Sequence, residues 1–195
     1  VHPAAVGALP VQLISSVAVF EAAAYRNRAV LESDDVSGWR GIHVGYSQTK
    51  WVSERLVLAA GAAGLPVTVY RPPLIGGHSQ TGAWHQDDLL HRLLRGCLAL
   101  GMAPDLPWEL DLVPVDYVVS AMDHLAHLEQ GDGECFHLVD PQGYRVGDVL
   151  GTFVAGREKV PVHRGGVIAL LDQLELHLAG VGQRHAHLQW RVLPA

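Results

Sequence analysis

A helix that stops at a glycine and leads directly into a β-branched run constrains the fold of this chain most. Residues 46–63, YSQTKWVSERLVLAAGAA, carry apolar side chains at helical spacing; Gly64 ends this helix and Pro66 prevents its continuation. The run VTVY at residues 67–70 then predicts a strand. Because helices that alternate with strands form parallel sheets covered by helices, the chain is predicted to be an α/β protein.

The same alternation extends to both sides of this unit. Further strands are predicted at residues 11–15, 110–115 and 135–139, and further helices at 87–100, 117–128 and 146–154. Asp116 is predicted to be the N-cap of the helix over 117–128. Residues 20–44 and 71–84 are predicted loops, because prolines, glycines and polar residues interrupt them.

Three regions are expected along the chain. Residues 1–75 are predicted to form a sheet core with the catalytic residues, and residues 76–160 a small α/β substrate-side region with returning core elements. Residues 161–195 form a tail whose pattern defines no fold.

Composition excludes several classes of function. The 14 basic residues are scattered and the net charge is −6, so no basic stripe for nucleic acid is present. The two cysteines, 38 residues apart, give neither a disulfide framework nor a cysteine zinc site, and none of the twelve histidines shows a metal-binding spacing. The first 20 residues fit neither a signal peptide nor a membrane helix, so a cytoplasmic protein without a metal is expected.

The spacing of Tyr46 and Lys50 indicates proton transfer. Side chains four residues apart emerge on one face of a helix, about one turn from each other. An ammonium group about 4 Å from a phenol favours the phenolate, and such a pair suits a general acid that protonates an oxyanion. An ordinary exposed Tyr/Lys pair is the alternative.

Two serines end the strand that precedes this helix. Ser15 and Ser16 follow an apolar run, and the carboxyl ends of strands in open α/β sheets are where ligands bind. Ser16 is predicted to donate a hydrogen bond to the same substrate oxygen that Tyr46 protonates. Alternatively, both serines only cap the strand end.

Taken together, these residues resemble the extended short-chain dehydrogenase/reductase superfamily, whose pattern is a strand-end Ser/Thr, then YxxxK, then Arg-Pro. Here these are Ser16, Tyr46 with Lys50, and Arg71 with Pro72. Four segments are similar to the thioester reductase branch, the terminal reductases of nonribosomal peptide and polyketide synthetases and of carboxylic acid reductases: GYSQTKWVSERLV, GLPVTVYRPPLIGGHSQTGAW, DDLLHRLLRGC and LDLVPVDYV. The resemblance covers about residues 11–155.

The resemblance implies a Rossmann-like doubly wound sheet and an NADPH-dependent reductive release, with NADH not excluded. The substrate would be an acyl or peptidyl thioester on the phosphopantetheine arm of a carrier protein, and the product an aldehyde or, after a second hydride, an alcohol. Ser16, Tyr46 and Lys50 would be catalytic, and Tyr46, Lys50, Arg71, Pro73 and Leu74 would bind the cofactor. Substrate contacts would come from His78, Ser79, Gln80, Thr81, Asp111 and Asp116.

One part of the family pattern is missing. No GxGxxG or GxxGxxG occurs in the chain, although a glycine-rich turn should meet the pyrophosphate of the cofactor. The sequence, which starts at Val1, is therefore expected to be the C-terminal part of a reductase. Two alternatives stay open: a nucleotide-sugar epimerase or dehydratase of the same superfamily, and a non-catalytic fragment that docks a carrier protein.

Overall fold

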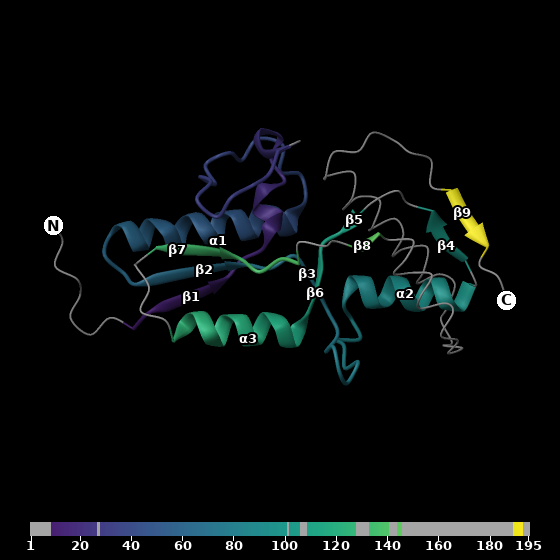
Figure 1. The fold of residues 1–195 in the computed structure, drawn as a ribbon. Helices are drawn as coiled ribbons and strands as arrows, with labels where there is room; N and C mark the ends of the chain where they lie inside the picture. Colours follow the sequence, from purple (N-terminus) through teal and green to yellow (C-terminus); the bar gives the residue numbers. More distant parts are fainter. Residues whose placement is uncertain are drawn as a thin grey trace. The chain divides into compact units, whose positions relative to one another are not determined.

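The computed structural model describes residues 9–26, 28–100, 102–105, 109–127, 133–140, 144–145 and 189–192. They belong to two compact units, Val1–Pro73 with Asp116–Val139, and Leu74–Val115 with Asp140–Ala195. Figure 1 shows the elements of both. The predicted helix over 146–154 lies outside the described residues, as does the predicted tail over 161–195 apart from residues 189–192.

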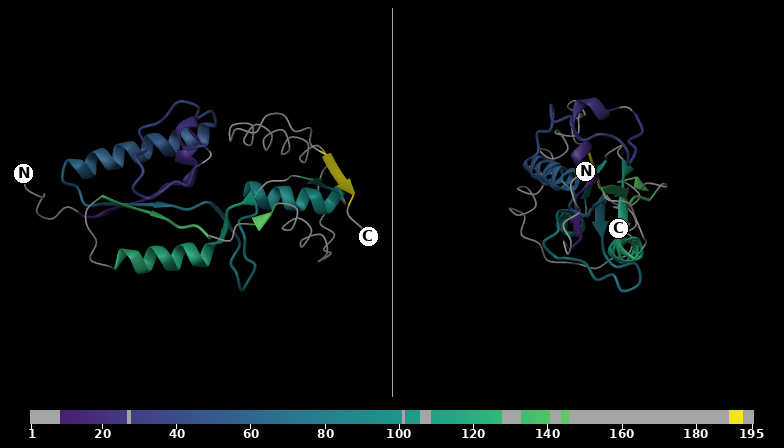
Figure 2. Two further views of the ribbon diagram at one scale, coloured as in Figure 1. Left: turned by 45° about the horizontal axis from the view of Figure 1, so that its top comes forward. Right: turned by 90° about the vertical axis from the view of Figure 1, so that its left-hand side faces the viewer.

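The first unit is built on a parallel sheet in the order β1-β2-β7. Helices α1 and α3 cover its two opposite faces (Figures 1 and 2). This arrangement confirms the predicted parallel α/β fold. The elements of this unit are β1 (Val11–Ile14), the 3-10 helices η1 (Val17–Phe20) and η2 (Ala23–Tyr25), α1 (Gly45–Ala62), β2 (Val67–Arg71), α3 (Val115–Ala126) and β7 (Glu134–His137).

The central strand β2 is the most buried part of the sheet. Val67, Val69, Tyr70 and Arg71 are all buried, because β2 has a strand on each side and a helix over each face. The preceding turn follows the prediction, since Gly64 has a φ of 100° and ends the helix as expected of a glycine at this position.

A smaller core holds the connection between β1 and α1 in place. Ala22, Tyr25 and Ile42 are buried together, and Phe20 and Trp51 pack against them. The Trp51 indole donates a hydrogen bond to the Val36 carbonyl at 2.6 Å. The predicted loop over 20–44 is therefore tied to α1 by its own apolar contacts and hydrogen bonds.

The described residues of the second unit form short strand pairs and an amphipathic helix. Leu90, Leu93, Leu94 and Cys97 on α2 are buried at helical spacing. Strand β3 pairs with β6 in parallel, whereas the pairs β4 with β9 and β5 with β8 are antiparallel. The elements are β3 (Leu74–Gly76), α2 (Leu89–Leu100), β4 (Met102–Asp105), β5 (Glu109–Leu110), β6 (Leu112–Pro114), β8 (Tyr144–Arg145) and β9 (Gln189–Val192).

Several local predictions were wrong. The predicted loop over 71–84 contains strand β3, and the predicted loop over 20–44 contains the 3-10 helix η2. Asp116 is not an N-cap, because α3 begins at Val115 and Asp116 lies in its first turn, where a carboxylate interacts favourably with the helix dipole. The strand expected over 110–115 is divided at Asp111, because β5 and β6 pair with different strands. No helix among the described residues is long and apolar enough to cross a membrane.

Candidate active site

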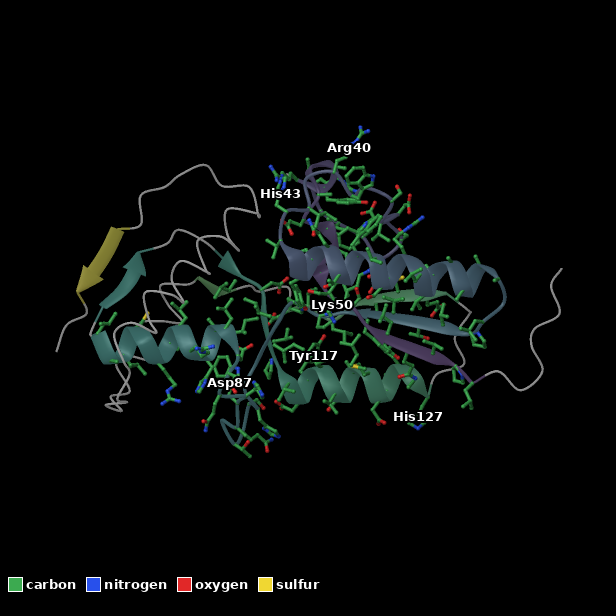
Figure 3. The ribbon with its side chains drawn as sticks, turned by 180° about the vertical axis from the view of Figure 1, so that it is seen from behind. Arg40, His43, Lys50, Asp87, Tyr117 and His127 are labelled. Carbon is green, nitrogen blue, oxygen red and sulfur yellow. The ribbon has the colours of Figure 1, made fainter. Side chains whose placement is uncertain are left out.

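Tyr46 and Lys50 lie in the first turns of α1, with the cation anchored to the sheet. The Lys50 ammonium donates a hydrogen bond to the Ile14 carbonyl at 2.9 Å, and its Nζ lies 5.7 Å from the centroid of the Tyr46 ring. Figure 3 shows Lys50 between α1 and the strands of the sheet. Tyr46 is half exposed. A phenol open to a ligand therefore sits beside a cation that the carboxyl end of β1 holds in place.

Ser16 follows β1 and directly precedes the 3-10 helix η1. Its Oγ accepts a hydrogen bond from the Ala18 backbone N–H at 3.2 Å, so Ser16 is the N-cap of η1. A hydroxyl that accepts one hydrogen bond keeps its own proton for donation. Ser16 is two residues after Ile14, whose carbonyl accepts the hydrogen bond from Lys50, so Ser16 and the Lys50 ammonium both lie at the carboxyl end of β1.

Ser15 has a different role from its neighbour. The Ser15 hydroxyl donates to Oε2 of Glu54 at 2.5 Å, and both side chains are buried. Its proton is committed to this carboxylate, whereas the proton of Ser16 is not part of that bond. The two adjacent serines thus have different hydrogen-bond partners, although the sequence does not distinguish them.

Arg71, predicted to bind the cofactor, has a guanidinium that is only 1% exposed. Its Nη2 and Nε donate to Oε1 of Glu54 at 2.6 and 3.1 Å. Its Nη1 donates to the Glu32 carbonyl and lies 3.2 Å from Nε2 of His137. The side chain is therefore occupied within the unit, and a contact between Arg71 and a cofactor would have to come from its backbone.

His137 accepts the Arg71 hydrogen bond as a neutral imidazole, because a guanidinium has only donors. Burial and the nearby Arg71 charge both lower the pKa of His137. The Glu32 carboxylate acts in the opposite direction and accepts the backbone N–H of His137 at 2.7 Å. The proton of the neutral ring is therefore on Nδ1.

Glu54 was not among the predicted site residues. This residue is four positions after Lys50, so it lies on the same helix face, and its side chain is fully buried. Helical spacing could have pointed to it as a third member of the set that starts at Tyr46. Its partners, Ser15 and Arg71, are 39 and 17 residues away, and no local pattern indicates them.

The second unit holds the predicted substrate loop. His78 and Ala83 close the turn, with the His78 N–H donating to the Ala83 carbonyl at 2.9 Å, and Ser79, Gln80 and Thr81 lie at the tip of this turn. Gln80 donates its backbone N–H to Nδ1 of His78 at 3.2 Å. The loop is therefore a defined turn that carries three consecutive polar side chains.

Asp111 and Leu74 come together in the same unit. The Leu74 N–H donates to the Asp111 carbonyl at 3.1 Å, which extends the pairing of β3 with β6. Burial raises the pKa of the Asp111 carboxyl, partly offset by a backbone hydrogen bond from Asp140. Pro73 and Asp116 belong to the first unit. The roles expected for these residues toward cofactor and substrate stay predictions.

The described residues contain no group of three or more His, Cys, Asp or Glu side chains that could hold a metal ion. Tyr46 and Lys50 place a phenol and an ammonium at the carboxyl edge of a parallel sheet, the edge at which open α/β sheets bind ligands. The sequence offers no glycine-rich turn for the pyrophosphate.

Comparison with known proteins identifies relatives. Residues 4–122 match the model of an NAD-binding family described as male sterility protein. The chain is 35% identical over 142 residues, 72% of its length, to a linear gramicidin synthase of Brevibacillus parabrevis. It is 44% identical over 102 residues, 51% of its length, to L-2-aminoadipate reductase of Schizosaccharomyces pombe.

A solved structure is similar over most of the chain. The terminal R domain from the myxalamid PKS-NRPS biosynthetic pathway matches with a TM-score of 0.72 and 36% identity, covering 89% of this chain. The chain spans 44% of that domain, 3% of the gramicidin synthase and 7% of the aminoadipate reductase.

Proposed function

Since the chain belongs to the NAD-binding male sterility protein family and is a thioester reductase-like domain of the short-chain dehydrogenase/reductase superfamily, we propose that the full protein releases a carrier-bound acyl thioester as an aldehyde. The observation that supports this most is the Lys50 ammonium, held by the Ile14 carbonyl beside the half-exposed Tyr46. This arrangement offers one proton donor and one fixed cation at the sheet edge where α/β proteins bind ligands.

Each of the three residues has a step in the proposed reaction. NADPH, when bound, supplies the hydride that reduces the thioester carbonyl carbon. Ser16 donates a hydrogen bond to the carbonyl oxygen and so polarises the bond. Tyr46 gives this oxygen its proton as negative charge develops there, and Lys50 stabilises the phenolate that remains. Loss of the carrier thiol then leaves the aldehyde, which a second reduction converts to an alcohol.

The choice of cofactor and partner belongs to the same proposal. We favour NADPH over NADH, and an acyl or peptidyl carrier protein with its phosphopantetheine thioester as the partner. The match to an NAD-binding family supports a nicotinamide cofactor, and the similarity to the terminal R domain of a PKS-NRPS pathway supports a carrier-bound substrate. A cytoplasmic location fits the two free cysteines, Cys97 and Cys135, because reducing compartments keep thiols unpaired.

The test is turnover by the full-length protein. We would supply a carrier protein loaded with an acyl thioester, follow NADPH absorbance, and identify the released aldehyde by mass spectrometry. Tyr46→Phe removes the proton donor but keeps the ring, so the rate is expected to fall by about 100-fold or more with cofactor binding retained.

Tyr117→Phe is the matched control, because Tyr117 is also an exposed tyrosine near the start of a helix. This variant should keep the wild-type rate. Turnover of a sugar nucleotide instead of a thioester would support the epimerase alternative. Carrier-protein binding without any reduction would support the docking alternative, and either result contradicts the proposal.

A further inference from the structure

Glu54 is a fully buried carboxylate on the helix that carries Tyr46 and Lys50. Burying a charge is unfavourable unless partners replace the lost water. Both oxygens of Glu54 have such partners: Oε1 accepts two hydrogen bonds from Arg71, and Oε2 accepts one from Ser15. The carboxylate therefore joins three elements, namely α1, β2 and the residue that follows β1.

The hydrogen bond from Ser15 connects the Glu54 carboxylate to the segment that carries Ser16. Ser15 directly precedes Ser16, and its backbone N–H donates to the Tyr70 carbonyl at 2.8 Å. The next residue but one, Val17, donates its N–H to the Pro72 carbonyl at 3.1 Å. Backbone bonds thus fix Ser16 relative to β2, whereas the Glu54 carboxylate fixes it relative to α1.

Lys50 provides a second link between the same two elements. It bonds the Ile14 carbonyl from one turn before Glu54 on α1. The segment from Ile14 to Ser16 is therefore held to the helix twice, once by a cation on its backbone and once by an anion on its hydroxyl. The bond from Lys50 involves a predicted catalytic residue. The bond between Ser15 and Glu54 involves none of the predicted catalytic residues.

The Arg71 side of the network makes Glu54 rigid. The guanidinium is 4.8 Å from the centroid of the Phe20 ring and also bonds the Glu32 carbonyl and His137. A guanidinium that has several partners restricts the position of the carboxylate to which it donates. Ser15 is therefore bound to a carboxylate that Arg71 holds through two of its nitrogens.

We propose that Glu54 is a positioning residue of the reductase site, which sets the spacing between the helix that bears Tyr46 and the strand end that bears Ser16. This inference rests on the proposed function. It assigns Arg71 to the same supporting set, as the group that orients Glu54. A buried ion pair that only stabilises the fold is the competing explanation.

The experiment compares Ser15→Ala, Glu54→Gln and the control Ser53→Ala in the full-length protein with the loaded carrier protein and NADPH. Ser53 is an exposed serine of α1 whose hydroxyl donates to the Thr49 carbonyl at 2.9 Å, so its replacement makes the same chemical change away from the network. Rates are measured at a temperature where circular dichroism shows each variant to be folded.

Positioning predicts a loss in kcat with little change in cofactor affinity. Ser15→Ala should lower kcat about 3- to 10-fold and Glu54→Gln at least about 10-fold, while the Kd of NADPH changes less than about twofold and Ser53→Ala behaves as wild type. The double variant should be no slower than Glu54→Gln alone, because both replacements act on the same contact between Ser15 and residue 54.

A fold-stabilising role predicts a different pattern. Folded Ser15→Ala and Glu54→Gln would then keep the wild-type kcat and show only a lower Tm, and this result would overturn the inference. Ser15→Ala alone decides the matter if Glu54→Gln does not fold, because it removes one hydroxyl and leaves the ion pair intact. A wild-type protein that reduces no thioester would contradict the proposed function itself.

Discussion

The ammonium of Lys50 lies 2.9 Å from the carbonyl oxygen of Ile14, 36 residues earlier in the chain. This hydrogen bond joins α1 to the carboxyl end of β1. This cation, which is predicted to be catalytic, is thus part of the contact between helix and sheet.

Replacing Lys50 with Met tests this contact. Lys50→Met keeps the length of the side chain but removes both the charge and the bond to Ile14, so kcat/KM for the thioester should fall about 100-fold or more. Arg55→Met on the same helix is the control, because Arg55 makes an exposed ion pair with Asp35, away from the sheet edge. Steady-state kinetics check both variants, and equal losses in the two would contradict the role of Lys50.

Acidic pH should weaken the fold through His137. Its pKa in the folded state is lowered, so the folded protein binds fewer protons than the unfolded chain, whose histidine titrates near 6.5. Stability is therefore complete above pH 6.5 and is lost as the pH falls below it. We expect His137→Gln, with an uncharged acceptor for Arg71, to lose less stability than wild type between about pH 7.5 and 5.5.

Urea unfolding at these two pH values measures the difference. His43→Gln serves as the control, because His43 is exposed and Figure 3 shows it on the loop between β1 and α1. The control should follow wild type. A His137→Gln variant with the wild-type pH dependence would show that this imidazole contributes nothing to it.

A methyl group at Gly61 should destabilise the packing of α1 on β2. A Cβ at this position would lie 2.5 Å from Cγ2 of Val67, a buried β-branched side chain that has few rotamers. Overpacking costs about 1–3 kcal/mol, and the higher helix propensity of alanine returns at most about 1 kcal/mol. Gly61→Ala should therefore lower the free energy of unfolding by roughly 1–2 kcal/mol in urea titrations.

Gly45→Ala provides the comparison, because a Cβ at Gly45 meets no atom within 4 Å. This variant should be as stable as wild type or slightly more stable. The double variant Gly61→Ala with Val67→Ala should be less destabilised than the sum of its parts. Simple additivity would argue against the contact.

The two thiols should differ in reactivity. Burial raises the pKa of Cys97 to about 11, so at pH 8 about one thiol in a thousand is ionised, and the side chain is also inaccessible. Cys135 is partly exposed, although burial raises its pKa too. In the Cys135→Ser variant, a disulfide reagent should label Cys97 only after unfolding. Rapid labelling of the native variant would show that this part of α2 opens readily.

Local patterns predicted the parts of the fold that depend on neighbouring residues. Gly64 and Pro66 indicated the end of α1, and the spacing of Tyr46 and Lys50 placed both on one helix face, because each signal acts within a few residues. The division of the strand at Asp111 was missed, since it depends on which strands pair with β5 and β6.

For the candidate site, too, the sequence indicated only features that depend on neighbouring residues. Ser16 and Ser15 are indistinguishable in the sequence, and only the packing of α1 on the sheet gives Ser15 a buried carboxylate as its partner. Arg71 was expected to bind the cofactor because of the family resemblance, and nothing nearby in the sequence indicates that its guanidinium is bonded to Glu54. Long-range ion pairs of this kind require the tertiary structure.

Among the described residues, β1 pairs with β2 alone, so its other side is an edge of the sheet. Val11 and Ser15 direct their N–H groups to β2, and the backbone groups of Gln12 and Ile14, which alternate with them, therefore point outward. A strand that joins this edge can bond the groups of Gln12, but at Ile14 it meets the Lys50 ammonium on the carbonyl oxygen. The Lys50 ammonium thus takes one of the two lone pairs of the Ile14 carbonyl, and a strand that joins this edge must share that oxygen with it.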